Sequence, residues 1–154
     1  MSTDPENTLV VDTTKGAITI AMRPDLAPNH VNRIKELVRE GFYDGIKFHR
    51  VIDGFMAQTG CPQGTGTGGS GQNLKAEFTP TKHVRGTCSM ARAANPDSGD
   101  SQFFICFAES PWLDNQYTVW GEVTDGMDTV DAIDKGEPPR NPDSIKSIKV
   151  AADA

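Results

Sequence analysis

Eight short β-rich runs and only two helical patterns follow one another in this sequence, and this order limits the possible folds more than any other feature. Strands and helices do not alternate, so the βαβ units that build parallel sheets are not predicted. We therefore expect a mainly β protein, a closed eight-stranded antiparallel β-barrel capped by two α-helices, whose closure leaves no exposed sheet edge. The predicted strands are 9–13, 17–22, 48–52, 55–58, 87–93, 102–107, 118–123 and 145–151.

The two helical patterns lie early and late in the chain. The first begins at Pro28, which fits a first helical turn, and ends before Gly41. Its apolar residues recur three and four positions apart, which predicts one face packed on the sheet, and the second pattern covers 125–133. We find neither an internal repeat nor a linker, so we assign 1–8 to a polar N-terminal tail and 9–152 to a single domain.

Charge and composition exclude several classes of function. The net charge of −6 and the lack of a basic tract disfavour nucleic acid as a partner. No apolar run is long enough to span a bilayer, and the first residues lack the basic and apolar regions of a signal peptide. We therefore expect a cytoplasmic protein that binds no membrane.

The three cysteines do not predict a disulfide framework or a zinc site, because Cys61, Cys88 and Cys106 are widely spaced and form no Cys-x-x-Cys pair. Cys88 and Cys106 fit strands as small core residues. Cys61 lies in a glycine-rich loop, where we expect it to be exposed, with a reactive thiol as an alternative role. Carboxylate pairs, Ser/His/Asp orders and Cys/His pairings do not stand out, so the sequence predicts neither a cofactor nor a metal.

The stretch 48–58 carries one cation among apolar neighbours. It is typical of two short strands joined at Asp53-Gly54, the strongest two-residue hairpin signal in the sequence. Alternation along the strand places Arg50 on an apolar face, whereas His49 points the other way and is expected to be structural. A guanidinium is always charged and needs partners, so Arg50 is either paired with a carboxylate or engaged in chemistry.

The segment 59–72 contains six glycines and is expected to form a long surface loop. A phosphate-binding P-loop would require a terminal Gly-Lys-Ser/Thr, which this stretch lacks. A serine-hydrolase elbow would require glycine at the position of Gln72, two residues after Ser70. We therefore predict the rim of a surface rather than a catalytic loop.

Five motifs, taken in order, carry a resemblance to a known family. They are 48–58, 64–71, Ser89-Met90-Ala91-Arg92-Ala93, Ser101-Gln102-Phe103-Phe104-Ile105 and Trp112-Leu113-Asp114. They resemble the cyclophilin family of peptidyl-prolyl cis-trans isomerases, in its compact prokaryotic form, over residues 9–151. The fold of that family, an eight-stranded antiparallel barrel capped by two helices, agrees with the strand count above.

The resemblance implies which residues form the site, and it implies neither a cofactor nor a metal. Arg50 would be the catalytic cation, together with Gln58. Arg92 stands where many members have asparagine, and Tyr117 replaces a histidine common in eukaryotic members. The implied substrate-binding residues are Phe55, Met56, Ala91, Arg92, Ala93, Gln102, Phe104, Trp112, Leu113 and Tyr117.

Residues of these types suit rotation about an X-Pro peptide bond. Twisting that bond localises the lone pair on the proline nitrogen, and a guanidinium that donates to it favours the twisted state over the planar ones. The expected function is peptidyl-prolyl cis-trans isomerisation that assists protein folding, with proline-containing peptides and unfolded or flexible segments as partners. The resemblance adds cyclosporin as a ligand, and we expect a monomer. One alternative is a proline-peptide binding module or chaperone with incidental isomerase activity, and another is a barrel whose Arg50 is merely salt-bridged.

Overall fold

The computed structural model describes residues 4–66, 68–137 and 139–153, so residues 1–3 of the predicted tail lie outside the described residues. The strands are β1 (Thr8–Thr13), β2 (Gly16–Met22), β3 (Arg50–Ile52), β4 (Met56–Thr59), β5 (Thr87–Met90), β6 (Phe103–Cys106), β7 (Val119–Asp125) and β8 (Ile145–Val150). The α-helices are α1 (Pro28–Arg39) and α2 (Met127–Ala132), and the 3-10 helices are η1 (Pro5–Asn7), η2 (Pro111–Leu113) and η3 (Ala151–Asp153). Within the described ranges, no helix is both long and apolar enough to cross a membrane.

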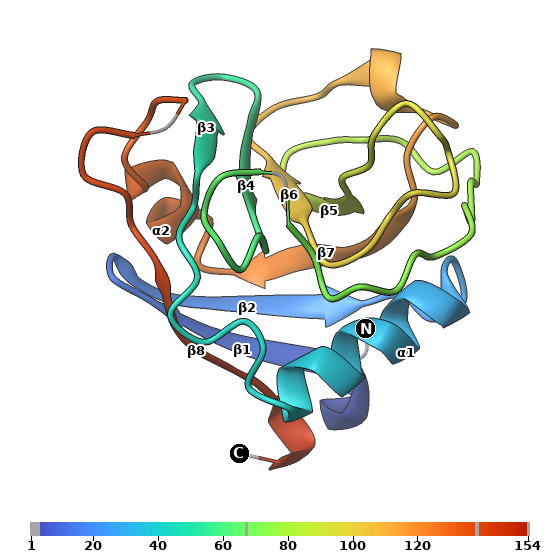
Figure 1. Ribbon diagram of the computed structural model, residues 1–154, viewed down its shortest axis with the longest axis horizontal. Coiled ribbons are helices and arrows are strands. Elements are labelled where there is room, and N and C mark those ends of the chain that lie inside the picture. Colours follow the sequence, from blue (N-terminus) through green and yellow to red (C-terminus); the bar gives the residue numbers. More distant parts are fainter. Residues whose placement is uncertain (1–3, 67, 138, 154) are drawn as a thin grey trace.

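All eight strands belong to one curved sheet in the order β3-β4-β6-β5-β7-β2-β1-β8, and neighbouring strands are antiparallel throughout. Figure 1 shows the sheet curling round, with β1, β2 and β8 on one side and β3, β4, β5 and β6 on the other. The prediction of a mainly β fold with eight antiparallel strands and two helices is therefore confirmed.

The barrel closes less completely than the sequence led us to expect. β3 and β8 stand at the two ends of the strand order, and no ladder joins them among the described residues. Instead, an isolated bridge pairs Lys47 with Ser144, and backbone hydrogen bonds run from Gly45 N to Ile145 O at 2.6 Å and from Ile145 N to Ile46 O at 2.8 Å. The chain runs beside the start of β8 at 45–47, before β3 begins. This short irregular segment, instead of a strand paired with β8, lies between β3 and β8.

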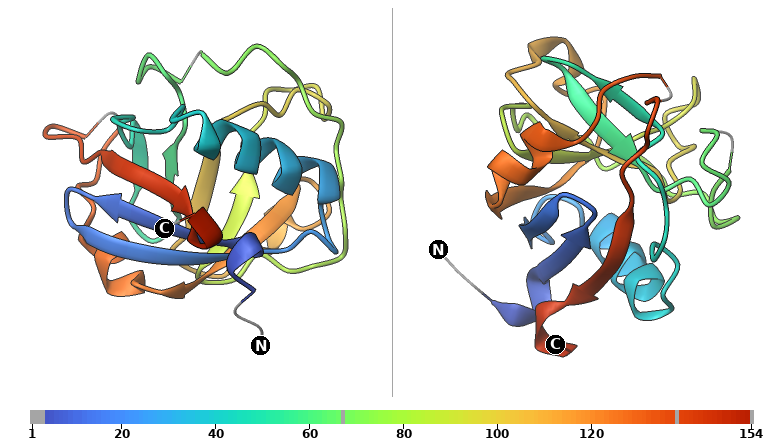
Figure 2. Two further views of the ribbon diagram at one scale, coloured as in Figure 1. Left: turned by 90° about the horizontal axis from the view of Figure 1, so that it is seen from below. Right: turned by 90° about the vertical axis from the view of Figure 1, so that its left-hand side faces the viewer.

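The two helices lie on opposite sides of the barrel, α1 against β8 and α2 against β2 (Figure 1). Figure 2 shows α1 lying across one end of the barrel. α1 is capped from a distance, because the Glu77 carboxylate accepts hydrogen bonds from the backbone N–H of Asn29 at 3.2 Å and of His30 at 2.9 Å. α2 is shorter than predicted, since Asp125 still belongs to β7 and Gly126 makes the turn with a positive φ of 92°. α1 buries the predicted apolar stripe and one histidine: His30, Val31, Ile34, Leu37 and Val38.

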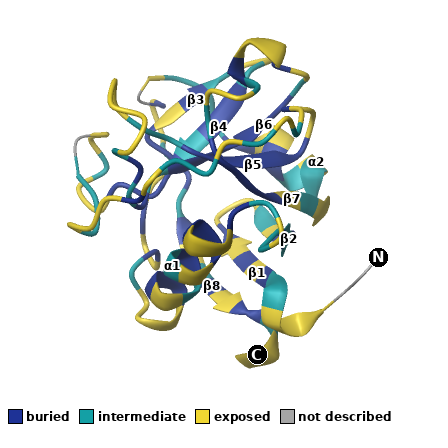
Figure 3. Ribbon diagram, turned by 90° about the vertical axis from the view of Figure 1, so that its right-hand side faces the viewer, coloured by how far each residue is buried: buried dark blue, intermediate teal, exposed yellow. Residues whose placement is uncertain are grey.

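The interior of the barrel is one large apolar cluster, and a smaller cluster lies outside it. Side chains alternate along the strands, so Val51, Ala57 and Ile105 form one inward-facing row across β3, β4 and β6. β5 and β6 are nonetheless buried along their whole length (Figure 3), so their outer faces must also be covered. The smaller cluster, which we call the pocket cluster, covers the outer face of β6, whereas His83 covers Ser89 on β5. The pocket cluster consists of Met56, Phe104, Cys106 and Leu113, with Ile52, Phe55 and Tyr117 packed against them.

All three cysteines are free and buried. This agrees with the core positions predicted for Cys88 and Cys106, but the expected exposure of Cys61 is wrong, because its exposed fraction is 0%. The glycine-rich loop wraps around this sulfur, and the backbone N–H groups of Gly66 and Gly68 each donate to Sγ at 3.3 Å. Burial opposes ionisation of the Cys61 thiol, but the backbone donors outweigh it and lower its pKa to about 6.

Candidate active site

Strand register brings four side chains into one row on the outer face of the barrel. Arg50 on β3 faces Gln58 on β4. Gln58 in turn faces Phe104 on β6, which faces Ser89 on β5. Opposed residues on neighbouring strands point to the same side of a sheet, so a cation, an amide and an aromatic ring meet there. The predicted hairpin is present, with Gly54 at the turn at a positive φ of 76°. Its loop has three residues, 53–55, instead of the predicted two, because Ile52 pairs with Met56, and this loop sets the register.

A small pocket of about 100 Å³ opens at this row. Sites that enclose a drug-sized ligand span roughly 300–1,000 Å³, so this pocket has room for a single ring or side chain. Apolar side chains of the pocket cluster form its floor, while polar and charged groups stand at its edge. Nine residues line it, and the resemblance implied all of them: Arg50, Phe55, Met56, Gln58, Ala91, Arg92, Phe104, Leu113 and Tyr117.

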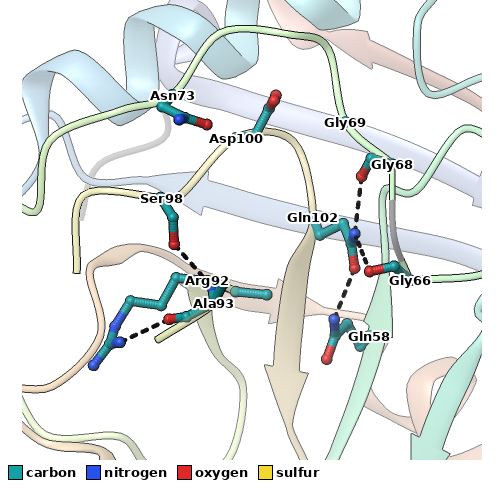
Figure 4. Close-up of a pocket in the computed structure, with 11 residues that line it drawn as sticks. Gln58, Gly66, Gly68, Gly69, Asn73, Arg92, Ala93, Ser98, Asp100 and Gln102 are labelled. Atoms are coloured by element: carbon teal, nitrogen blue, oxygen red, sulfur yellow. Dashed lines mark hydrogen bonds between the residues drawn. The ribbon is translucent and has the colours of Figure 1, made fainter. Parts of the chain in front are cut away.

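The other three implied residues lie beside this pocket. Trp112 is 64% exposed, and its ring centroid is 5.6 Å from that of Phe55, so it stands at the rim. Ala93 and Gln102 line a neighbouring pocket of about 290 Å³, shown in Figure 4. Three residues border both pockets and so connect them: Gln58, Ala91 and Arg92.

Arg50 is half-exposed and loosely held. Its Nη1 donates to Gln58 Oε1 at 3.4 Å, and its Nε lies 3.8 Å from the carboxylate of Glu137. The exposed fractions of the Arg50 and Glu137 side chains are 45% and 54%, and an ion pair this long between exposed groups contributes little to stability. A structural salt bridge therefore does not account for the position of Arg50, and most of its five N–H donors remain available to a ligand.

Two glutamines connect Arg50 to the glycine-rich loop, and Figure 4 shows the part of this connection that runs from Gln58 through Gln102 to the loop. Gln58 Nε2 donates to Gln102 Oε1 at 2.9 Å. Gln102 Nε2 donates to the carbonyl oxygens of Gly66 at 3.0 Å and of Gly68 at 2.9 Å. These two carbonyls fix which end of the Gln102 amide is the donor, and so turn the oxygen of Gln58 toward Arg50. The loop predicted to be a surface rim therefore also orients the site.

Asp100 fastens the glycine-rich loop. Its carboxylate accepts hydrogen bonds from the backbone N–H of Ser70 at 2.8 Å and of Gly71 at 3.0 Å, and also from the Ser70 hydroxyl. Arg33 on α1 donates to the same hydroxyl oxygen at 3.0 Å. A Cβ at Gly69 would collide with the Asp100 carboxylate, which explains the glycine at that position. No local pattern in the sequence points to Asp100, because its partners lie about thirty residues away in sequence and follow no periodic pattern.

A group of hydrogen-bonded polar residues, also not predicted from the sequence, lies behind the pocket floor. His83 Nδ1 lies 3.0 Å from Asp114 Oδ1, and His83 Nε2 lies 2.9 Å from Ser89 Oγ. Burial lowers the pKa of His83, and the Asp114 carboxylate opposes that shift. Ser89 is fully buried, so these residues cannot attack a substrate as a hydrolytic triad does. The His83 ring stacks on Phe104 with centroids 6.2 Å apart, and the group therefore supports the pocket floor.

His49 lies behind the glycine-rich loop and Gln102, and not in either pocket. It is buried and is not a lining residue of either pocket. Its ring packs against the glycine-rich loop, where a Cβ at Gly66 would lie 3.4 Å from it. Across the described part of the chain, no three His, Cys, Asp or Glu side chains gather closely enough to hold a metal ion.

Fold and site together define an antiparallel barrel protein whose site is a ring-sized apolar pocket on the outer face, with a cation at its edge. The family described as Cyclophilin type peptidyl-prolyl cis-trans isomerase/CLD matches residues 8–150. The chain belongs to this family. The resemblance carried by the five motifs, and the isomerase class that it implied, are confirmed.

Similar proteins and structures agree with this assignment. A probable peptidyl-prolyl cis-trans isomerase of Brucella suis biovar 1 (strain 1330) is 50% identical, over 97% of this chain and 85% of the relative. A peptidyl-prolyl cis-trans isomerase of Synechococcus elongatus is 43% identical, over 94% of this chain and 97% of the relative. The cyclophilin AquaCyp293 from Hirschia baltica superposes with a TM-score of 0.92 at 32% identity, over 100% of this chain and 77% of that chain.

One similar structure was solved with a small peptide. It is a cyclophilin type peptidyl-prolyl cis-trans isomerase of Cryptosporidium parvum, crystallised in the presence of the dipeptide Ala-Pro. Its TM-score is 0.87 at 31% identity, over 93% of this chain and 98% of that chain.

Proposed function

We propose that this isomerase acts on X-Pro bonds at the pocket beside Arg50, with Arg50 as the catalytic cation and Gln58 as its partner. One observation carries the proposal: a half-exposed guanidinium without a close ion pair stands at the edge of an apolar pocket of about 100 Å³. The dipeptide Ala-Pro in the crystals of the Cryptosporidium parvum relative supports proline-containing peptides as the ligand class.

The proposed mechanism lowers the barrier to rotation without a covalent step. An X-Pro bond resists rotation because the amide nitrogen shares its lone pair with the carbonyl group, and peptide-bond rotation has a barrier of ~18–20 kcal/mol. In the twisted state the lone pair stays on nitrogen, where the Arg50 guanidinium donates to it. This contact is stronger in the twisted state than in either planar isomer, which is the condition for catalysis.

The apolar floor contributes by fixing the proline ring. Met56, Phe104 and Leu113 are buried and form the pocket cluster beneath Arg50. They hold the ring while the rest of the peptide turns, and they exclude water that would weaken the interaction with the guanidinium. An acceleration of about a hundred-thousandfold requires only ~7 kcal/mol from these contributions together.

The remaining site residues are proposed to hold the peptide on either side of the proline. Ala91 and Arg92 line both pockets, which together we call the groove, whereas Ala93 lines only the larger pocket and Tyr117 only the smaller one. Trp112 stands at the rim against Phe55. Gln102 acts through the orientation of Gln58.

A proline-peptide binding module or chaperone with incidental isomerase activity is the second candidate. The neighbouring pocket of about 290 Å³ and the 64% exposure of Trp112 favour it, because both extend the surface beyond what one proline ring needs. This candidate uses the same groove, so only separate measurements of affinity and rate distinguish the two.

The Arg50→Ala variant separates the two candidates. For an enzyme, we expect the rate of isomerisation of an Ala-Pro peptide to fall about a hundredfold, as when one transition-state donor is removed elsewhere, while the dissociation constant changes by less than about threefold. Arg23→Ala, which removes an arginine of 40% exposure outside the pocket, is the matched control. An unchanged isomerisation rate in Arg50→Ala would contradict the catalytic role.

Several broader properties are part of the same proposal. We propose that residues 9–152 act as a single monomeric domain in the cytoplasm, where unfolded or flexible protein segments are the substrates and folding is assisted. Three free cysteines support a reducing compartment. Cyclosporin is proposed as a ligand at the Trp112 rim, and a fluorescence titration of the two tryptophans tests it. Sedimentation tests the monomer.

A further inference from the structure

A second arginine borders the proposed proline pocket, and aromatic rings lie against it. Arg92 lines both pockets. Its guanidinium carbon lies 4.7 Å from the ring centroid of Tyr117 and 5.9 Å from that of Phe78. Figure 4 shows this head group turned away from Gln102 and the second pocket. The charged end of Arg92 therefore lies against the rings of Tyr117 and Phe78 and does not point into the second pocket.

Backbone carbonyl groups fix the same head group. Arg92 Nε donates to Gln116 O at 2.9 Å, and Nη1 donates to Ala93 O at 2.9 Å and to Ala94 O at 3.3 Å. Gln116 belongs to the loop that follows η2, whereas Ala93 and Ala94 belong to the loop that follows β5. One side chain thus joins the two loops that border the pocket, and it does so with donors at fixed angles in a planar fork.

Tyr117 is the wall residue that Arg92 touches. Its ring meets Phe104 at an interplanar angle of 78° with centroids 5.7 Å apart, and it packs against the pocket cluster. The chain around the ring is irregular: Asn115 has a positive φ of 61°, and β7 begins only at Val119. Side-chain contacts, rather than a strand, therefore determine where the Tyr117 ring lies.

We propose that Arg92 is a positioning residue that stacks on Tyr117 and holds its ring as the side wall of the proline pocket. The inference rests on the proposed function and deepens it. A cation over an aromatic face is attractive, and the three carbonyl partners leave the guanidinium little freedom to move. Lysine cannot replace it, because an ammonium has neither the planar face nor the fork.

The kinetic consequence differs from that of Arg50. A wall that touches the proline ring does so in the cis, trans and twisted states alike, so it provides uniform binding. Loss of uniform binding raises KM more than it lowers kcat. Arg92→Gln and Tyr117→Ala are each expected to raise KM about fivefold, which corresponds to ~1 kcal/mol at 1.4 kcal/mol per tenfold.

A double-mutant cycle on an Ala-Pro peptide tests the proposal. Because both residues act through one wall, the variant Arg92→Gln/Tyr117→Ala is expected to have a KM no more than about twofold above either single variant, instead of the ~25-fold rise that independent effects would give. Tyr117→Phe keeps the ring and should raise KM less than Tyr117→Ala does, whereas Arg92→Lys should behave like Arg92→Gln. Arg85→Gln, at an exposed arginine paired with Asp131 outside the pocket, is the control for the loss of a positive charge.

A measurement without substrate gives an independent reading. Hydrogen-bonded to Gln116 O, the Arg92 Nε–H should give a slowly exchanging NMR signal that moves in Tyr117→Ala and not in Arg85→Gln. Multiplicative effects in the cycle, or a KM in Arg92→Gln within twofold of the original protein, would overturn the proposal. Either result is distinct from a failure of the proposed function. In that case the unmodified protein itself would not accelerate isomerisation, although the NMR signal of Arg92 Nε–H would still be present.

Discussion

Replacing Gln102 with alanine is expected to lower kcat/KM about tenfold, because Gln102 determines which atom of Gln58 faces Arg50. The present geometry contains three hydrogen bonds of Gln102, two from its Nε2 to Gly66 O and Gly68 O and one to its Oε1 from Gln58 Nε2. A neutral hydrogen bond of this kind contributes about 0.5–1.5 kcal/mol. Only the last of these bonds restrains Gln58. Its loss should therefore reduce transition-state stabilisation by ~1.4 kcal/mol, which lowers the rate about tenfold.

The isosteric change Gln102→Glu sharpens this test. A carboxylate cannot donate to the two loop carbonyls, but it still accepts the hydrogen bond from Gln58 Nε2, so at pH 7 we expect Gln102→Glu to keep more of the activity than Gln102→Ala. Exchange NMR on an Ala-Pro peptide measures the rate directly. Gln72→Ala, at an exposed glutamine of the same loop, is the control and should stay within about twofold, a free-energy change below ~0.5 kcal/mol. Full activity in Gln102→Ala, which removes the acceptor for Gln58, would refute the orienting role.

Three further predictions concern stability and the buried thiol. Glu77→Ala removes the distant cap of α1 and the 2.6 Å contact with His30 Nδ1. Thermal unfolding should show a loss of about 2–4 kcal/mol in stability, which corresponds to a Tm decrease of roughly 5–15 °C. The control Glu40→Ala, at an exposed position, should lose under ~0.5 kcal/mol. Burial lowers the pKa of His30 and of His83. Below pH 6.5, the ordinary pKa of histidine, the unfolded chain therefore binds more protons than the folded protein. The free energy of unfolding, measured with urea, should decrease as the pH falls from about 6.5 to the pKa values in the folded protein. The decrease is ~1.4 kcal/mol per histidine for each unit by which its folded pKa lies below its unfolded pKa. Stability that is constant or increases on acidification from pH 7.5 to pH 5.5 would contradict this. Cys61 has a pKa of about 6 but 0% exposure, so a thiol reagent at pH 7.5 should react slowly with the folded protein and rapidly in urea; equal rates would contradict the burial.

Much of the fold followed from local patterns in the sequence. The Asp53-Gly54 signal and strand alternation predict the hairpin of β3 and β4. A two-residue turn would place Arg50 opposite Ala57, however, and only the three-residue loop 53–55 places Arg50 opposite Gln58. The apolar periodicity after Pro28 likewise predicts the buried face of α1. These features depend on neighbours within a few residues, which is why sequence reasoning finds them.

Every feature that could not be predicted from the sequence depends on contacts between distant segments. Glu77 caps a helix that begins almost fifty residues earlier, at Pro28, and Asp100 binds the loop around Ser70. Cys61 was expected to be exposed because its neighbours are glycines, yet small residues let the loop close over the sulfur. The glycine-rich composition therefore predicted the loop correctly, but the burial of Cys61 depends on how the loop folds around its sulfur.

The incomplete closure of the barrel has the same origin. Hydrophobic patterning predicts how many strands form, but not whether the first and last of them meet edge to edge. The segment before β3 is held to β8 by an isolated bridge at Lys47 and Ser144. The outcome depends on the length and course of the connecting chain, which no local pattern encodes.

The cis-trans exchange rate of an Ala-Pro peptide, measured by NMR with catalytic amounts of the original protein and of Arg50→Lys, tests the central claim most directly. Lysine keeps the charge of Arg50 but loses the planar fork, which donates to Gln58 and is proposed to donate to the proline nitrogen as well. We predict rapid exchange with the original protein and a rate at least about tenfold lower with Arg50→Lys, which corresponds to ~1.4 kcal/mol of lost transition-state stabilisation. Equal rates for the two proteins would contradict the role of the guanidinium.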